Sequence, residues 1–228
     1  DIKVVNIGSL NANTATNNVL ISDDAINNVW NITDNNKGTL NSQLSFNGFA
    51  NLLGGKNADT FSFNGVLANI TGVIDGGLGA DMLNLTAAGR DLRVRLVNAN
   101  KVVSAGDVNI INVESIDASA TQNNSLIASD VQNQWSITSK NSGLLSTADS
   151  SVQFTNFSNL IGGLGADNFV FDVLGELTGY IDGGTGDASK DIVDVSKLAH
   201  ANIVLGSDGI GYRNVENYIG NNTDSTLT

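Results

Sequence analysis

The amino-acid sequence repeats itself at a spacing of about 106 residues, which restricts the chain to folds built from stacked copies of one unit. The order of the recurring segments and the spacing between them are both kept. We therefore expect two tandem repeats. The recurring segments are NNVLISDDAINNVWNIT at Asn17 and NNSLIASDVQNQWSIT at Asn123; FNGFANLLGGKNADTFSF at Phe46 and FTNFSNLIGGLGADNFVF at Phe154; and GVIDGGLGAD at Gly72 and GYIDGGTGDASKD at Gly179.

The edges of the repeats resemble one another as well. These three seams place the first repeat at 1–111, the second at 112–213 and the start of a third at 214–228. We expect one continuous array that extends in both directions in the parent protein. The seams are NIGSLNANTATNNVLI at Asn6, NVESIDASATQNNSLI at Asn112 and NVENYIGNNTDSTLT at Asn214.

A shorter period of about 22 residues lies inside each repeat. The Gly-Gly pair at Gly54 recurs at Gly76, and the pair at Gly162 recurs at Gly183. This spacing fits one turn of a parallel β-helix, so a repeat would hold about five turns. The sequence therefore predicts an all-β parallel β-helix, or β-solenoid, of about ten turns, roughly 50 Å long at the usual strand spacing. Apolar residues alternate with small or polar ones as strands require, at Phe61 and Phe63, at Leu83 and Leu85, and at Phe169 and Phe171.

Composition narrows the class of protein further. With 41% hydrophobic and 15% charged residues the chain can bury a core, and the lack of cysteine excludes disulfides and cysteine-ligated zinc. The net charge of -12 argues against nucleic acid or an anionic membrane as partner. The 20 Asp outnumber the 3 Glu, which indicates turn and metal chemistry rather than helices. No transmembrane run or signal-peptide pattern is visible, so we expect any export signal or anchor to lie outside this segment.

Four loops carry a glycine-aspartate pattern. GGLGADMLN at Gly76 and GGLGADNFV at Gly162 match G-G-x-G-x-D-x-U-x, the nonapeptide of calcium-binding β-roll proteins. GGKNADTFS at Gly54 differs only at Asn57, and asparagine can still take the left-handed conformation of the glycine it replaces. GGTGDASKDIV at Gly183 contains a three-residue insertion before its aspartate.

The pattern predicts two calcium sites, each between two loops on adjacent turns. Calcium takes six to eight oxygen ligands, and one loop supplies about three, as glycine carbonyls and an Asp carboxylate. The alternative is that these loops are ordinary solenoid corners, in which Asp bonds nearby backbone amides. The first predicted site comprises Gly54, Gly55, Asn57, Asp59, Asp75, Gly76, Gly77, Gly79 and Asp81, and the second comprises Gly162, Gly163, Gly165, Asp167, Asp182, Gly183, Gly184, Gly186 and Asp191.

The chain resembles the repeat regions of giant bacterial adhesins, both filamentous-haemagglutinin-like and of the repeats-in-toxin type. The sequence segments that carry this resemblance are WNIT at Trp30, FANLLGG at Phe49, GVIDGG at Gly72 and NVES at Asn112, together with the nonapeptides. The resemblance implies an extracellular stalk, secreted or on the bacterial cell surface, that sometimes self-associates in biofilms. It also implies that calcium triggers folding after export.

Other functions are less well supported by the residues. We expect no enzyme, because His200 is the single histidine and has no counterpart in the first repeat. Arg93 and Arg95 lie on one face of an expected strand; we read them as a solvated face, and the alternative is a contact for an acidic polysaccharide. Trp30 and Trp135 are expected to be buried rather than to stack on a ligand. A calcium-dependent surface-layer or self-association module and a carbohydrate-binding module remain open, and the expected partners are neighbouring repeats, with the fragment itself monomeric.

Overall fold

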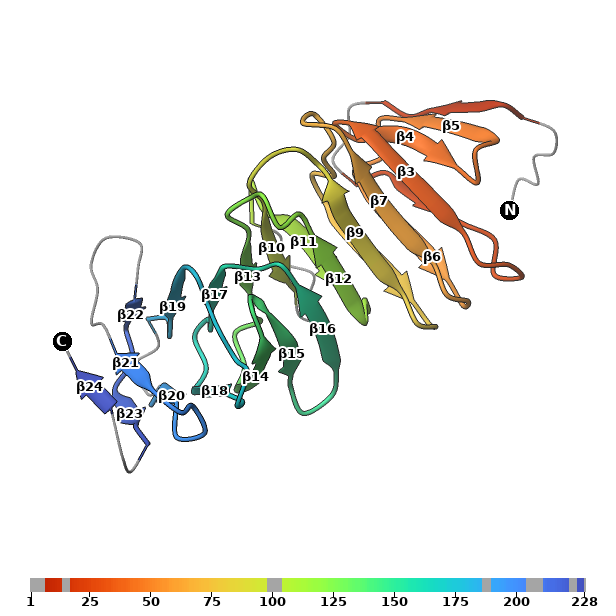
Figure 1. Ribbon diagram of the computed structural model, residues 1–228. Coiled ribbons are helices and arrows are strands. Elements are labelled where there is room, and N and C mark those ends of the chain that lie inside the picture. The colour runs from red at the N-terminus through yellow and green to blue at the C-terminus, as the bar shows by residue number, and fades with distance from the viewer. Residues whose placement is uncertain are drawn as a thin grey trace. The chain divides into compact units, whose positions relative to one another are not determined.

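The computed structural model describes residues 7–13, 17–97, 104–185, 190–203, 211–221 and 225–227 (Figure 1). These residues form β-strands and turns without any helix, which confirms the predicted all-β class. No helix that could cross a membrane is therefore present in this part of the chain. Two compact units are formed: unit 1 combines Asp1–Arg90 with Ala99–Ser119, and unit 2 combines Asp91–Asn98 with Ala120–Thr228.

Unit 1 contains two sheets, which we call the hairpin sheet and the parallel sheet. The hairpin sheet has the order β1-β5-β4-β3-β7-β9-β12, and only β4 runs antiparallel to its neighbours. The parallel sheet has the order β2-β6-β8-β11, and all of its strands are parallel. The strands are β1 (Ser9–Asn11), β2 (Val19–Ile21), β3 (Val29–Asp34), β4 (Lys37–Leu40), β5 (Leu44–Asn47), β6 (Asn51–Gly55), β7 (Thr60–Asn64), β8 (Val73–Gly77), β9 (Met82–Ala87), β11 (Val108–Ile111) and β12 (Ser115–Ala118).

Unit 2 is built in the same way. Its hairpin sheet has the order β16-β15-β14-β18-β20-β23, and its parallel sheet has the order β10-β13-β17-β19-β22. A separate parallel pair is formed by β21 and β24. The strands are β10 (Arg93–Leu96), β13 (Ser125–Ile127), β14 (Asn133–Ser139), β15 (Ser142–Ser146), β16 (Ser151–Thr155), β17 (Asn159–Ile161), β18 (Asp167–Phe171), β19 (Tyr180–Asp182), β20 (Ile192–Asp194), β21 (Ala201–Ile203), β22 (Gly211–Arg213), β23 (Asn217–Ile219) and β24 (Ser225–Leu227).

Strands far apart in sequence lie side by side in register. In unit 1 Leu52 pairs with Ile74, 22 positions further on, as the spacing of the Gly-Gly pairs predicts. Elsewhere the step is longer, because Trp30 pairs with Phe61, 31 positions further on, with the β4–β5 hairpin lying between them in sequence. Long parallel sheets with this stacking are compatible with a β-solenoid.

Each unit has an aromatic core of the same design. Trp30 is fully buried and stacks on Phe61 of the adjacent strand, with ring centroids 5.6 Å apart, while Phe46 meets it edge-on at 5.8 Å. Trp135 stacks in the same way on Phe169 at 5.4 Å, with Phe154 edge-on at 5.9 Å. The prediction that both tryptophans are buried is confirmed, and the alternating apolar residues of the strands are buried beside them. Such offset aromatic contacts add about 1 kcal/mol beyond burial.

The hairpins of the two hairpin sheets turn at asparagines. Asn36 lies between β3 and β4 with φ 54°, and Asn141 lies between β14 and β15 with φ 52°. Asparagine tolerates this left-handed region better than other residues with a side chain. The two turns also form the same contact, because the side-chain oxygens of Asn36 and Asn141 accept the backbone N–H groups of Thr71 and Thr178, both at 2.9 Å. Periodicity alone did not predict these hairpins.

Candidate functional site

The Gly-Gly loops of unit 1 lie directly beside one another. Gly54 and Gly55 end β6, Gly76 and Gly77 end β8, and Gly55 pairs with Gly77 in the ladder. A β-carbon on Gly77 would clash with the carbonyl oxygen of Gly55, so the backbones approach more closely than a side chain would allow. Asp59 and Asp81 follow, each immediately before the next strand of the hairpin sheet.

The aspartates of these loops turn inward and form a column that runs through unit 1. The backbone N–H of Asn28 donates to Oδ1 of Asp59 at 2.6 Å, and the N–H of Asp59 donates to Oδ1 of Asp81 at 2.7 Å. The N–H of Asp81 donates in turn to the carboxylate of Glu114 at 2.7 Å. We call Asn28, Asp59, Asp81 and Glu114 the acid column of unit 1. Each carboxylate thus accepts a backbone N–H at the start of a strand in the preceding turn.

Unit 2 contains the same column. The N–H groups of Asn133, Asp167 and Asp191 donate to Asp167, Asp191 and Glu216 at 3.0, 2.8 and 2.8 Å, respectively. The side-chain amide of Asn133 also donates to Asp167 at 2.6 Å, just as that of Asn28 donates to Asp59 at 2.8 Å. Each column therefore begins with a neutral asparagine and ends with a glutamate.

The second carboxylate oxygen of the aspartates is buried and has no hydrogen-bond partner. This holds for Oδ2 of Asp59, Asp81 and Asp167, whose residues are each 1% exposed. Burial raises the pKa of all three carboxyls, to about 6 for Asp81 and about 7 for Asp167. Neighbouring acidic groups raise them further, Glu114 for Asp81 and Asp191 for Asp167. Ionised carboxylates in these positions are costly unless a proton or a cation neutralises them.

The first glycine of each pair makes room for the inward aspartate. A β-carbon on Gly54 would lie 2.5 Å from Oδ2 of Asp59 and would clash with the carbonyl oxygen of Gly76. Gly162 has the same relation to Asp167 and to the carbonyl oxygen of Gly183. The glycine is thus required by the close approach of the next turn.

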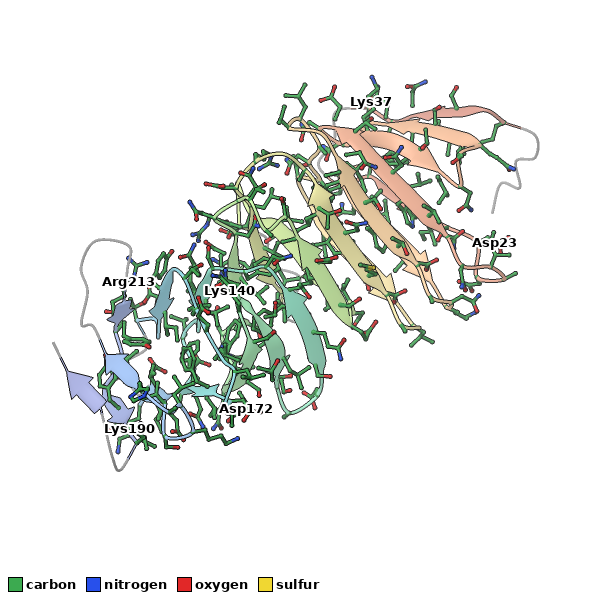
Figure 2. The ribbon with its side chains drawn as sticks, viewed as in Figure 1. Asp23, Lys37, Lys140, Asp172, Lys190 and Arg213 are labelled. Carbon is green, nitrogen blue, oxygen red and sulfur yellow. The ribbon has the colours of Figure 1, made fainter. Side chains whose placement is uncertain are left out.

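The aspartates that precede the Gly-Gly pairs bind the following turn instead. Oδ1 of Asp75 accepts the side-chain amide of Asn112 at 2.8 Å, and Oδ1 of Asp182 accepts that of Asn214 at 2.7 Å. Asp182 also forms an ion pair with Arg213, labelled in Figure 2, at 2.8 Å. Asn112 and Asn214 have positive φ angles of 52° and 51°.

The remaining predicted ligand residues follow the Gly-Gly pairs in their loops. Asn57 does not have a positive φ, so it does not use the left-handed conformation that the sequence allowed; its side chain donates to the backbone oxygen of Asp24 at 2.5 Å. Gly79 does have a positive φ and lies against Asn57. Gly165 lies against the backbone of Val131. Gly186 lies outside the described residues.

Sequence reasoning missed both ends of the acid columns. Asn28 and Asn133 precede the tryptophan strands, and Glu114 and Glu216 belong to the NVES and NVEN seams. Their recurrence at the repeat spacing was the available signal. It was not interpretable, because neither end carries a glycine motif.

The column chemistry suits a hard cation. Buried carboxylate oxygens without partners and glycine carbonyls at adjacent turns are the ligand types that calcium prefers. Among the described residues no group of three or more acidic, histidine or cysteine side chains is arranged to hold a metal ion, so carboxylates alone would not complete a ligand set. Backbone oxygens and water would have to complete the ligand set.

Comparison with family models, curated proteins and solved structures finds no match for this chain. The remaining sequence candidates are not members of the acid columns. Arg93 and Arg95 occupy alternate positions of β10, as predicted, and His200 is exposed.

Proposed function

We propose that the chain is a structural stalk segment of a large secreted or surface-anchored bacterial adhesin. In this proposal it is a β-solenoid of about ten turns, built from two tandem repeats of about 106 residues, and its repeats hold an adhesive part of the parent protein away from the cell. The supporting observation is that unit 1 and unit 2 bury equivalent residues at equivalent levels, including Trp30 with Phe61 and Trp135 with Phe169. Repetition of a buried framework is what a spacer needs.

The use of the acidic side chains also favours a structural function. In both units the carboxylates of the columns accept backbone N–H groups from the adjacent turn, and they are shielded from solvent. A catalytic carboxylate has to reach a substrate, whereas these atoms close strand ends. We therefore propose no catalytic residue.

Calcium is part of the proposal, held between stacked loops. In unit 1 Oδ2 of Asp59 and of Asp81, with nearby glycine carbonyls, would bind the ion, and in unit 2 Asp167 and the Gly183 loop would do so. The support is the buried carboxylate oxygen without a hydrogen-bond partner at Asp59, Asp81 and Asp167, together with the acid–acid repulsion along the column. A bound divalent cation would neutralise that charge and couple folding to the calcium concentration.

Calorimetry of the chain with and without calcium tests the proposal. After chelator treatment, added calcium should raise the melting temperature, while magnesium at the same concentration should raise it less because it demands octahedral geometry. Unchanged melting would overturn the calcium sites. Calcium-dependent lattices in light scattering, or retention on a glycan array, would overturn the passive stalk in favour of a self-association or carbohydrate-binding module.

A further inference from the structure

One strand leaves the unit to which its sequence neighbours belong. Residues on both sides of Asp91–Asn98 belong to unit 1, but this segment is part of unit 2. There its strand β10 pairs in parallel with β13, with Arg93 opposite Ser125 and Arg95 opposite Ile127. The repeat predicted at 1–111 therefore donates a strand to the sheet of the following repeat.

The donated strand is held by a defined set of contacts. Oδ1 of Asp91 accepts the N–H of Asn123 at 2.8 Å, and the N–H of Leu92 donates to the side-chain oxygen of Asn124 at 3.1 Å. The carbonyl oxygen of Leu92 accepts the N–H of Ser125 at 2.8 Å. Leu92 and Val94 are buried. Backbone pairing supplies the docking, and two apolar side chains fix its register.

The same strand arrangement occurs a second time in unit 2. β21 pairs in parallel with β24, with Ala201 opposite Ser225. Here too the earlier strand precedes an NVE-type seam, NVEN at Asn214, and its partner follows that seam. Parallel pairing of strands across a seam therefore occurs twice among the described strands, although β21 and β24 both belong to unit 2.

Strand β2 of unit 1 is the counterpart of β13, and it lacks a donated neighbour among the described strands. Asn17 and Asn18 precede β2 as Asn123 and Asn124 precede β13. β2 is the terminal strand of the parallel sheet of unit 1, with β6 as its partner. Its side chains are also more exposed: the relative exposures are 50% for Val19 and 59% for Ile21, against 6% for Ser125 and 1% for Ile127.

Half of the backbone groups of β2 bind β6, and the other half point to an outer edge that can accept a strand. The oxygen of Asn18 accepts the N–H of Asn51, and the N–H of Ser22 donates to Leu53, so these residues face β6. Alternate residues of a parallel strand face opposite neighbours, so Val19 and Ile21 face the outer edge. Exposed edges of this kind are paired or protected in natural proteins.

We propose that the outer edge of β2 is a docking site for a strand of the Asp91–Leu96 type that another copy of the repeat donates. Charge supports this occupant, because the strand carries two arginines whereas the chain has a net charge of -12, and Asp23, labelled in Figure 2, follows the end of β2 by two residues in the sequence. Recognition is strand addition to a sheet edge, in which main-chain hydrogen bonds supply the binding. The inference extends the proposed tandem array, but the pairing itself requires no calcium.

Cysteine cross-linking tests the site and its register, because the natural chain has no cysteine. Val19→Cys and Ile21→Cys chains are incubated with synthetic peptides of residues 90–98 that carry Arg93→Cys or Arg95→Cys. Directly opposite residues of neighbouring strands lie about 4.8 Å apart, within disulfide range, and residues offset by two positions do not. We expect the 93–19 and 95–21 pairs to form mixed disulfides about tenfold faster than the 93–21 and 95–19 pairs. Equal rates for all four pairs would overturn the proposal.

A matched pair of proline variants separates docking from folding. Val19→Pro removes the N–H that would bind the donated strand, so the melting temperature should stay unchanged while the 95–21 cross-link slows to the mismatched rate. Ser125→Pro removes the N–H that already binds Leu92, so it should lower the melting temperature. Fast cross-linking in Val19→Pro would overturn the docking site. A normal calcium response together with failed cross-linking would overturn this inference and leave the proposed function standing.

Discussion

Units 1 and 2 share a buried framework but differ in their edges. Each has a tryptophan stacked on a phenylalanine and a column that runs from asparagine through two aspartates to glutamate. In unit 2 the donated strand β10 covers the first strand of the parallel sheet, whereas the counterpart in unit 1, β2, is exposed. The comparison shows that the two units share their interior and differ at the first strand of the parallel sheet, which a further strand covers only in unit 2 among the described strands.

The largest expected effect comes from the aromatic cores. Trp30→Ala and Trp135→Ala should each lower the free energy of unfolding by about 3–5 kcal/mol, because each removes a fully buried side chain and its stacking partner contact. Urea titration followed by circular dichroism measures both. A cost several kcal/mol smaller in one unit would show that the two cores are not equivalent.

The second-largest loss of stability from a substitution is expected at the first glycine of a Gly-Gly pair. Gly54→Ala and Gly162→Ala should each cost about 2–3 kcal/mol, because the new methyl group meets the backbone of the next turn and a buried carboxylate. Gly8→Ala is the control, since nothing lies within 4 Å of its β-carbon position and its φ is ordinary. Thermal melts of the three variants should separate the loop glycines from this control.

The acid columns should make the calcium-free protein less stable as pH rises. Burial raises the folded-state pKa of Asp81 to about 6 and of Asp167 to about 7, above the ordinary 3.8. The folded chain therefore binds more protons than the unfolded chain, and stability falls as pH rises from about 4 through these values, on the order of 4 kcal/mol between pH 5 and pH 8. Melting in chelator at pH 5 and pH 8 measures it. A higher melting temperature at pH 8 would contradict the buried-acid interpretation.

Replacing one carboxylate in each column sharpens the comparison. Asp167→Asn keeps an oxygen for the N–H of Asn133 and removes a buried charge, so at pH 8 in chelator it should raise stability by about 1 kcal/mol. Asp81→Asn should act in the same direction but less, because the pKa of Asp81 is raised less. Both variants should lose calcium stabilisation of their unit in calorimetry. Retained calcium stabilisation in both would rule these carboxylates out as ligands.

Surface ion pairs should contribute least. Lys56 pairs with Asp24 at 2.5 Å in unit 1, and Lys140 pairs with Glu176 at 3.1 Å in unit 2, but the side chains are half exposed or more. Lys56→Ala and Lys140→Ala should therefore leave the denaturation midpoint nearly unchanged. Chemical denaturation in low and high salt checks this. A clear fall of the midpoint at low salt that disappears at high salt would indicate that the pair supports its loop.

Some features were predictable because they depend on local pattern and spacing. The 22-residue step between Gly-Gly pairs predicted that Leu52 would lie beside Ile74, and alternation predicted that Phe61 and Phe63 would be buried. The antiparallel hairpins were not predicted, since their turns at Asn36 and Asn141 carry no glycine or proline. The strand order at β10 was also not predictable, because a repeat boundary in sequence does not state which sheet a strand joins.

The sequence by itself determined the alternating strands that follow the glycine loops, their buried faces and the step at which the glycine loops of unit 1 stack, because periodicity sets which side chains must leave water together. Only the tertiary structure decided the direction of the aspartates, which turn inward to the N–H groups of a neighbouring turn. It also decided which unit receives Asp91–Asn98. Both depend on contacts between segments 20 to 35 positions apart, and such contacts form only when the turns are stacked.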